Sequence, residues 1–315
     1  MRLAGFTLVE IMVATLLAVL AVASAAGVVA RGRGTYRSVE SQARMEETAR
    51  AALDLLGAEI HMAGYLGLAP PGTPVAGSTA VGNDAPAGLG ADGGCVASLA
   101  LDFAAPVAGA DGALAASQGV PLGCRASPQG RSIAGTDTLV LRHASAIAAR
   151  PEAGRLQIES TRRSARLLAD GTTVLESAGR LHDVETSAFY VSADSTGLAA
   201  RPSLRRKRLV GGAAPSFQDE ELVTGVEDLQ VEAAVQSDDA SGVADRHVPL
   251  DHIGADARPR ALRVWVLVRS DVADPAPVAL PALAYANRDL PPESSRYRRL
   301  LASRSFQLRN AGPSS

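Results

Sequence analysis

At residues 5–10 the chain reads Gly5-Phe6-Thr7-Leu8-Val9-Glu10, and the run from Ile11 to Ala30 that follows contains no charged residue. A run of about 20 residues forms a helix about 30 Å long, which matches the hydrocarbon core of a bilayer. Glu10 lies at the start of this run, where an unpaired carboxylate costs roughly 2.5 kcal/mol or more. The sequence therefore predicts a membrane-inserted helix in which Glu10 has a partner or a function.

The basic residues around the apolar run do not decide its orientation. Arg2 precedes the run, whereas Arg31, Arg33 and Arg37 follow it, so the positive-inside rule leaves the topology ambiguous or even inverted. Two ordinary interpretations are an uncleaved membrane anchor and a secretory signal peptide cleaved among the small residues at 21–26. Neither interpretation gives Glu10 a partner.

A third interpretation accounts for Glu10. The stretch from Gly5 to Glu10 resembles the type IV prepilin signature, a glycine followed by a hydrophobic residue, with a glutamate as the fifth residue after the cut. This resemblance implies that a membrane aspartyl peptidase cleaves between Gly5 and Phe6 on the cytoplasmic side and methylates the new amino terminus of Phe6. The Phe6 ammonium would then pair with Glu10 of its own or a neighbouring subunit, and such pairing selects one register in a medium of low dielectric constant. The rest of the chain would lie outside the inner membrane.

Beyond the apolar run, the pattern predicts an amphipathic helix over residues 35–64. Its apolar residues recur mostly at steps of three and four: Tyr36, Val39, Ala43, Ala49, Leu53, Leu56, Ile60 and Ala63. Gly64 is a natural stop, and the glycines within 27–34 are expected to bend or locally melt the helix. The exit Met62-Ala63-Gly64-Tyr65-Leu66-Gly67 resembles the PilW family, minor pilins of the type IV pilus.

The rest of the chain divides into a loop-rich part and a strand-rich part. Residues 68–135 are dense in Gly, Ala, Pro and Ser, which predicts a long irregular excursion with a short strand near 98–103. Apolar alternation then predicts strands at 136–142, 156–159, 184–191, 221–235 and 261–268, and a last strand that ends near Asn310. Several of these segments also resemble PilW minor pilins; Ala233-Ala234 departs from that family, where an aromatic residue is expected.

Cys95 and Cys124 are the only cysteines. Two cysteines are too few for a disulfide scaffold, and their spacing matches no zinc motif. If the prepilin resemblance places them in an oxidising periplasm, they should pair, close a loop of about 30 residues and contribute on the order of 3–4 kcal/mol. The alternative is two free buried thiols.

Composition and charge argue against nucleic acid as the main partner. The 315 residues suffice for one large or two modest domains, but the net charge is -2 and only 3% of residues are aromatic. One compact basic cluster, Arg205-Arg206-Lys207-Arg208, is a candidate surface contact for DNA phosphates, an acidic neighbouring pilin or lipid headgroups. A solvated face is the common meaning of such a run.

The sequence contains no catalytic or metal-binding motif that we recognise. The segment 247–252, together with Asp238, Asp239 and Asp245 upstream, offers imidazole and carboxylate groups, but it has neither EF-hand nor zincin spacing. We predict a solvated loop there, and the alternative is a loop that binds a divalent ion. We also predict that the protein is not an enzyme and needs no metal or cofactor.

Together these features predict an α+β, type IV pilin-like fold with a long N-terminal helix packed on an antiparallel head. The predicted parts are a leader (1–5), a transmembrane or filament-core helix (6–34), its amphipathic continuation (35–64), a Gly/Ala/Pro-rich loop region (65–135) and a β-rich head (136–315). The resemblance implies a minor pilin of a tip or priming complex, whose head lies in the periplasm or at the pilus tip. Its partners would be other minor pilins, the major pilin, the prepilin peptidase and the inner-membrane assembly platform. The alternatives are a type II secretion pseudopilin, a tip adhesin or DNA-uptake module, and a periplasmic enzyme on a membrane tether.

Overall fold

The computed structural model describes residues 7–78, 97–111, 132–169, 171, 178–236, 246–253 and 259–310. The chain divides into two compact units, Met1–Arg44 and Met45–Ser315, and each is considered by itself. Its described secondary structure is one long helix and mostly antiparallel strands, which confirms the α+β class.

Helix α1 runs from Leu8 to Met62. It contains no proline and is rich in Ala, Leu, Arg and Glu, which are strong helix formers. The helix continues through residues 27–34, so the expected local melting does not occur. A single glycine costs only about 1 kcal/mol relative to alanine, whereas a break costs the backbone hydrogen bonds of a whole turn.

The larger sheet is built around β6, which is long enough to pair with two strands on one edge. The first part of β6 pairs with β4 and the last part with β7, while β3 runs along the opposite edge. All pairs in this sheet are antiparallel except β1 with β5. The eight strands are β1 (Val75–Ala76), β2 (Val107–Ala110), β3 (Thr138–Ala148), β4 (Gln157–Ser160), β5 (Ala165–Leu168), β6 (Arg180–Ser192), β7 (Ser203–Val210) and β8 (Ser216–Thr224).

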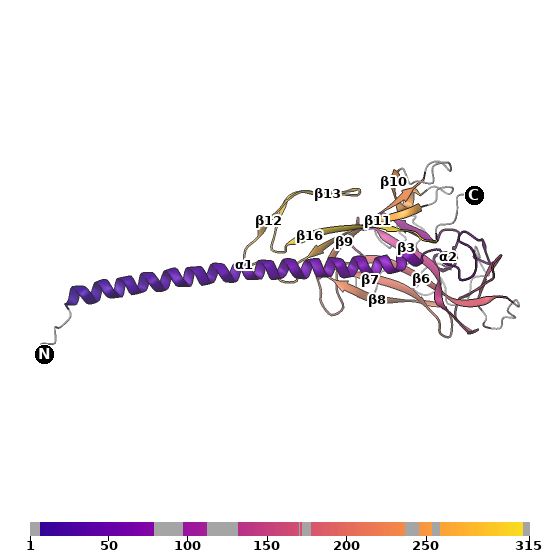
Figure 1. Cartoon of the computed structure of the whole chain (residues 1–315), viewed down its shortest axis with the longest axis horizontal. Helices are drawn as coiled ribbons and strands as arrows, with labels where there is room; N and C mark the ends of the chain where they lie inside the picture. The colour runs from indigo at the N-terminus through magenta and orange to yellow at the C-terminus, as the bar shows by residue number, and fades with distance from the viewer. Residues whose placement is uncertain are drawn as a thin grey trace. The chain divides into compact units, whose positions relative to one another are not determined.

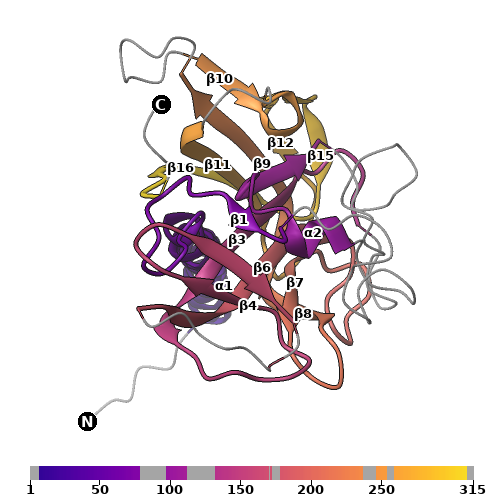
Figure 2. The ribbon, with the colours of Figure 1, turned by 90° about the vertical axis from the view of Figure 1, so that its right-hand side faces the viewer.

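A second sheet has the order β10-β9-β11-β16 and is antiparallel throughout. Figure 2 shows its strands grouped apart from those of the larger sheet. Its strands are β9 (Val226–Val235), β10 (Arg246–Pro249), β11 (Pro259–Arg269) and β16 (Arg299–Gln307). The remaining elements are two short ribbons, β12 (Val278–Leu280) with β15 (Glu293–Ser295) and β13 (Leu283–Tyr285) with β14 (Arg288–Leu290), the short helix α2 (Ala97–Leu101) and the 3-10 turn η2 (Leu250–His252).

The C-terminal part of α1, from Met45 onward, packs into a core shared by both sheets (Figure 1). Leu56 and Ile60 are fully buried, and each such side chain contributes about 1.5–3 kcal/mol through burial. They meet residues of both sheets: Leu139, Leu141, Phe189, Leu204, Leu229, Val264 and Phe306. The predicted apolar face begins later than expected, because Tyr36 and Val39 lie in the first unit and are 70% and 64% exposed.

The end of α1 is closed by the C-terminal tail. Gly64 follows the helix with φ = +78°, a conformation that favours glycine, and its N–H donates to Arg142 O at 2.9 Å. The Asn310 side-chain amide lies 3.2–3.3 Å from the carbonyl oxygens of His61 and Met62, the last two residues of α1, and of Ala63, which follows the helix. These bonds satisfy helix carbonyls that have no partner within the helix.

Most predicted strands are confirmed. The short strands β1, β2, β5, β10 and β12–β15 were not predicted, and three further segments differ from the prediction. The segment 221–235 is two strands, β8 and β9, divided at Gly225 (φ = +86°). The strand predicted near 98–103 is wrong, because residues 97–101 form α2. Strand β7 was not predicted: it contains the basic run 205–208, whose charges hide the alternation of buried and exposed positions.

Candidate functional site

The segment Leu8–Val28 of α1 is long and apolar enough to cross a membrane. Its large apolar side chains are exposed within the first unit, as Leu16 and Val19 illustrate. This composition is compatible with a membrane anchor, and a signal sequence shares it. An exposed apolar helix surface of this length requires lipid or other helices around it.

Glu10 lies in the first turn of α1 and forms a capping box with Thr7. The Glu10 carboxylate oxygen Oε2 accepts hydrogen bonds from the Thr7 backbone N–H and hydroxyl, both at 2.9 Å, and the Glu10 N–H donates to Thr7 Oγ1 at 3.3 Å. The two side chains thereby satisfy backbone donors at the helix start. Sequence reasoning missed this role of Thr7, although the Thr-x-x-Glu spacing carries the signal.

Two groups of predicted site residues lie outside the described residues. Gly5 and Phe6 are the predicted cleavage and methylation positions, and Cys95 and Cys124 are the predicted disulfide. Cleavage, methylation and cysteine pairing therefore stay predictions.

The structure separates the basic cluster onto the two faces of β7. Arg205 and Lys207 point into the head and are buried. Arg205 lies 2.7 Å from Asp219 and 3.0 Å from Glu221, and the ammonium of Lys207 lies 3.0 Å from Asp219. Both acids come from β8, the antiparallel neighbour of β7. These two basic residues form structural ion pairs with Asp219 and Glu221 within the head.

Arg206 and Arg208 lie on the opposite face of β7. The Arg206 guanidinium contacts Glu59 at 3.0 Å and Glu220 at 2.6 Å. The Arg208 side chain is 49% exposed and lies 3.7 Å from Glu220. The cluster is therefore not the continuous exposed patch that the sequence suggested, because strand alternation buries two of its members; contact of Arg208 with a partner stays a prediction.

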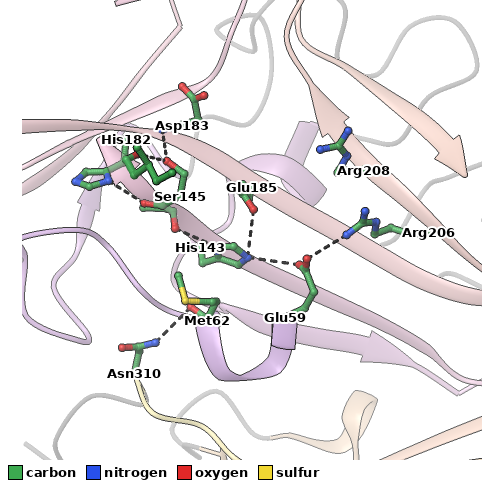
Figure 3. A network of polar contacts seen from close by, with 12 residues as sticks. Glu59, Met62, His143, Ser145, His182, Asp183, Glu185, Arg206, Arg208 and Asn310 are labelled. Carbon is green, nitrogen blue, oxygen red and sulfur yellow. Dashed lines mark hydrogen bonds and ion pairs between the residues drawn. The ribbon is translucent and has the colours of Figure 1, made fainter. Parts of the chain in front are cut away.

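A network of polar side chains connects α1 to the larger sheet (Figure 3). His143 of β3 directs its Nε2 atom toward two carboxylates, 3.5 Å from Glu59 of α1 and 3.8 Å from Glu185 of β6. The other ring nitrogen, Nδ1, lies 2.9 Å from the Ala144 carbonyl oxygen. Arg206 contacts the second oxygen of Glu59. No local sequence motif identifies these residues, because they lie far apart in the chain.

The charges in this network stabilise one another. Burial alone would lower the pKa of His143, but the hydrogen bond and charge of Glu59, with the charge of Glu185, outweigh burial and raise this pKa. Burial likewise opposes ionisation of Glu59, yet His143 and Arg206 hold the pKa of Glu59 below its usual value.

Asp137 occupies a second buried polar region, between β3 and β9. Its N–H donates to Leu229 O, and its Oδ2 accepts from the Val231 N–H, both at 2.8 Å. Within the described part of the chain, its other carboxylate oxygen is buried without a partner. Burial, together with nearby negative charges that include Asp228, outweighs the Val231 hydrogen bond and raises the pKa of Asp137 to about 8.

The segment 247–252 is not the loop that was predicted, because it forms the end of β10 and the turn η2. His252 is exposed and pairs with Asp251 at 2.8 Å. Asp238, Asp239 and Asp245 lie outside the described residues.

Residues 188–310 match the family model of the type IV pilus-assembly protein W (PilW). This part of the chain is PilW-like. Comparison with curated proteins and with solved structures gives no significant match. The PilW-like region extends from the second half of β6 to Asn310, so it includes β7, the whole second sheet and the residue that closes α1. This match supports involvement in type IV pilus assembly, and PilW is a pilus-assembly family rather than a known enzyme family.

Proposed function

We propose that this chain is a minor pilin that acts in the tip or priming complex of type IV pilus assembly. One observation carries the proposal: an exposed apolar helix with Glu10 in its first turn belongs to the same chain as a PilW-like region. The resemblance of residues 5–10 to a prepilin leader would give this carboxylate a partner in addition to the capping box. The head would lie in the periplasm, and in the pilus tip after assembly.

The apolar part of α1 would first occupy the inner membrane and then the filament. Helices in a bilayer associate through close packing and polar contacts. The exposed segment Leu8–Val28 offers both, because Ala-rich turns alternate with larger side chains and Glu10 lies at one end. The head would then select its neighbours by surface fit. These neighbours would be other minor pilins and the major pilin, with the assembly platform beneath them.

Processing would create the partner of Glu10. Cleavage between Gly5 and Phe6 by a prepilin peptidase would leave a charged, N-methylated amino terminus on Phe6. Glu10 would pair with that terminus in its own or a neighbouring subunit. The capping box already uses one carboxylate oxygen of Glu10, so the same side chain would both begin the helix and set the register of assembly.

Three substitutions separate these two roles of Glu10. Glu10→Gln retains a capping oxygen and removes the charge, Thr7→Val retains the charge and removes the capping hydroxyl, and Glu10→Ala removes both. Each variant replaces the natural chain in a piliated cell, and immunoblots measure the chain in sheared pili and in membranes.

The proposal predicts that Glu10→Gln and Glu10→Ala are both processed and membrane-bound but reach the pili more than tenfold less, since an unpaired charge costs roughly 2.5 kcal/mol. Thr7→Val should assemble nearly normally. Normal assembly of Glu10→Gln would show that the carboxylate only caps the helix, and the charge-pair proposal would then be wrong.

A further inference from the structure

Three potential metal ligands converge where α1 meets the larger sheet. Glu59 comes from α1, His143 from β3 and Glu185 from β6, and their ligand atoms all lie within 4.8 Å of one another. Figure 3 shows the three side chains directed toward a common point from different elements. This convergence lies outside the apolar segment Leu8–Val28 and does not depend on the proposed function.

The distances fit a shared ion better than direct hydrogen bonds. His143 Nε2 lies 3.5 Å and 3.8 Å from the two carboxylates, whereas charge-assisted hydrogen bonds are about 2.7–2.9 Å long. Two ligand atoms at about 2.1 Å from a tetrahedral zinc ion are separated by about 3.4 Å. The separations of His143 Nε2 from the two carboxylates are therefore close to that of two ligands on one ion.

Two of the ligands are already oriented by outer partners. His143 Nδ1 contacts the Ala144 carbonyl oxygen at 2.9 Å; since a carbonyl only accepts, Nδ1 carries a hydrogen, and an ion that displaces the proton from Nε2 would meet the lone pair of that nitrogen. Arg206 holds Oε1 of Glu59, while Oε2 faces His143. Such supporting contacts are a regular feature of metal-binding histidines and carboxylates.

The geometry points to a binding site for a divalent transition-metal ion of the zinc class, formed by Glu59, His143 and Glu185 with solvent at the remaining position. An imidazole ligand disfavours calcium and magnesium, which prefer oxygen ligands. The two carboxylates balance the charge of the ion, while Arg206 is balanced by Glu220. Glu185 is 46% exposed, which provides an entry path. A bound ion would join α1 directly to β3 and β6.

The test uses the full chain without a histidine tag, purified in detergent and freed of metal by a chelator. Titration with Zn²⁺ is followed by calorimetry, and Co²⁺ is added separately because its visible spectrum reports coordination geometry. The variants are Glu185→Gln and His143→Gln. His252→Gln is the matched control, because it removes the exposed histidine–carboxylate pair at η2. Fluorescence of Trp265, the only tryptophan, verifies folding and measures the melting temperature.

The proposal predicts one equivalent of Zn²⁺, a tetrahedral Co²⁺ spectrum and a higher melting temperature with the ion bound. Glu185→Gln and His143→Gln should weaken binding by at least roughly tenfold, and His252→Gln should leave it unchanged. If His143→Gln does not fold, Glu185→Gln decides, because its side chain is half exposed. Absence of binding by the natural chain, or equal binding by Glu185→Gln, would overturn the proposal.

Discussion

Arg205 and Arg208 lie three residues apart in β7, and their surroundings differ because strand neighbours alternate between two faces. The Arg205 side chain is 4% exposed and contacts two acids of β8, whereas that of Arg208 is 49% exposed and has one distant carboxylate. A run of like charges thus contains both a buried structural residue and a solvated one. Their contributions to stability should differ accordingly.

Replacing Arg205 with alanine should destabilise the head by about 3–5 kcal/mol. The loss is large because Asp219 and Glu221 would remain in place without their guanidinium partner. Arg208→Ala should cost at most about 1 kcal/mol, as is typical of exposed pairs. Urea unfolding of the full chain in detergent, followed by Trp265 fluorescence, measures both. Equal costs for the two variants would contradict the buried assignment of Arg205.

Asp137 should make the stability of the head decrease as pH rises. The pKa of Asp137 is about 8 in the folded chain and 3.8 in the unfolded chain. Between these values the unfolded state has released the proton and the folded state retains it, so stability is greatest below about pH 4 and is lost as pH rises through about 8. The change from pH 5 to 8 should be on the order of a few kcal/mol.

Asp137→Asn isolates this effect, because it keeps the shape of the side chain and cannot ionise. The unfolding free energies of the two chains are measured by urea titration at intervals from pH 5 to 8. We expect the unfolding free energy of the natural chain to fall by about a few kcal/mol relative to that of the variant over this range. Parallel pH profiles would mean that Asp137 is already ionised in the folded head.

At the residue scale, sequence reasoning singles out residues that conflict with their surroundings. Glu10 was singled out because a carboxylate in an apolar run requires an explanation. The contact of Glu59 with His143 could not be predicted in this way. These residues lie far apart in the chain, and their proximity depends on how α1 packs against β3.

At the scale of elements, Gly57 sets the distance between α1 and β16. A Cβ atom at this position would overlap Cε1 of Phe306. The Phe306 ring is buried in the shared core and cannot move away without disturbing it. Glycine is unfavourable inside a helix, so its presence here is explained by the close approach of the ring.

Gly57→Ala should therefore destabilise the head by about 1 kcal/mol. Overpacking costs about 1–3 kcal/mol, and the gain in helix propensity returns only about 1 kcal/mol. The control is the same substitution made together with Phe306→Leu, which removes the clash; relative to Phe306→Leu alone, Gly57→Ala should then stabilise. Chemical unfolding of all four chains gives the coupling free energy. Stabilisation by Gly57→Ala alone would refute the close-packing explanation.

Regular elements followed from the sequence when their apolar period was clear. The period of two predicted β3, β6, β11 and β16, and the apolar run predicted α1. Strand β7 was missed because buried ion pairs, unlike buried apolar side chains, leave no hydrophobic alternation in the sequence. The short helix α2 was misassigned because a mostly apolar segment of five residues fits a strand and a helix equally well.

At the scale of the whole molecule, α1 is divided between two compact units, and the second unit contains the PilW-like region. The head's own core uses α1 only from Met45 onward. The apolar segment Leu8–Val28 is long enough to cross a membrane, and we propose that it also contacts other subunits. This division of one helix between head packing and assembly is the central claim of the proposed minor-pilin function.

The most direct test is the identity of the mature amino terminus. The full chain is expressed with and without a prepilin peptidase, and its N-terminal peptide is determined by mass spectrometry. The minor-pilin account predicts a chain that begins with N-methylated Phe6 only when the peptidase is present. A chain that keeps Met1 in the presence of the peptidase, or that begins at Ser24 or Gly27, would contradict it.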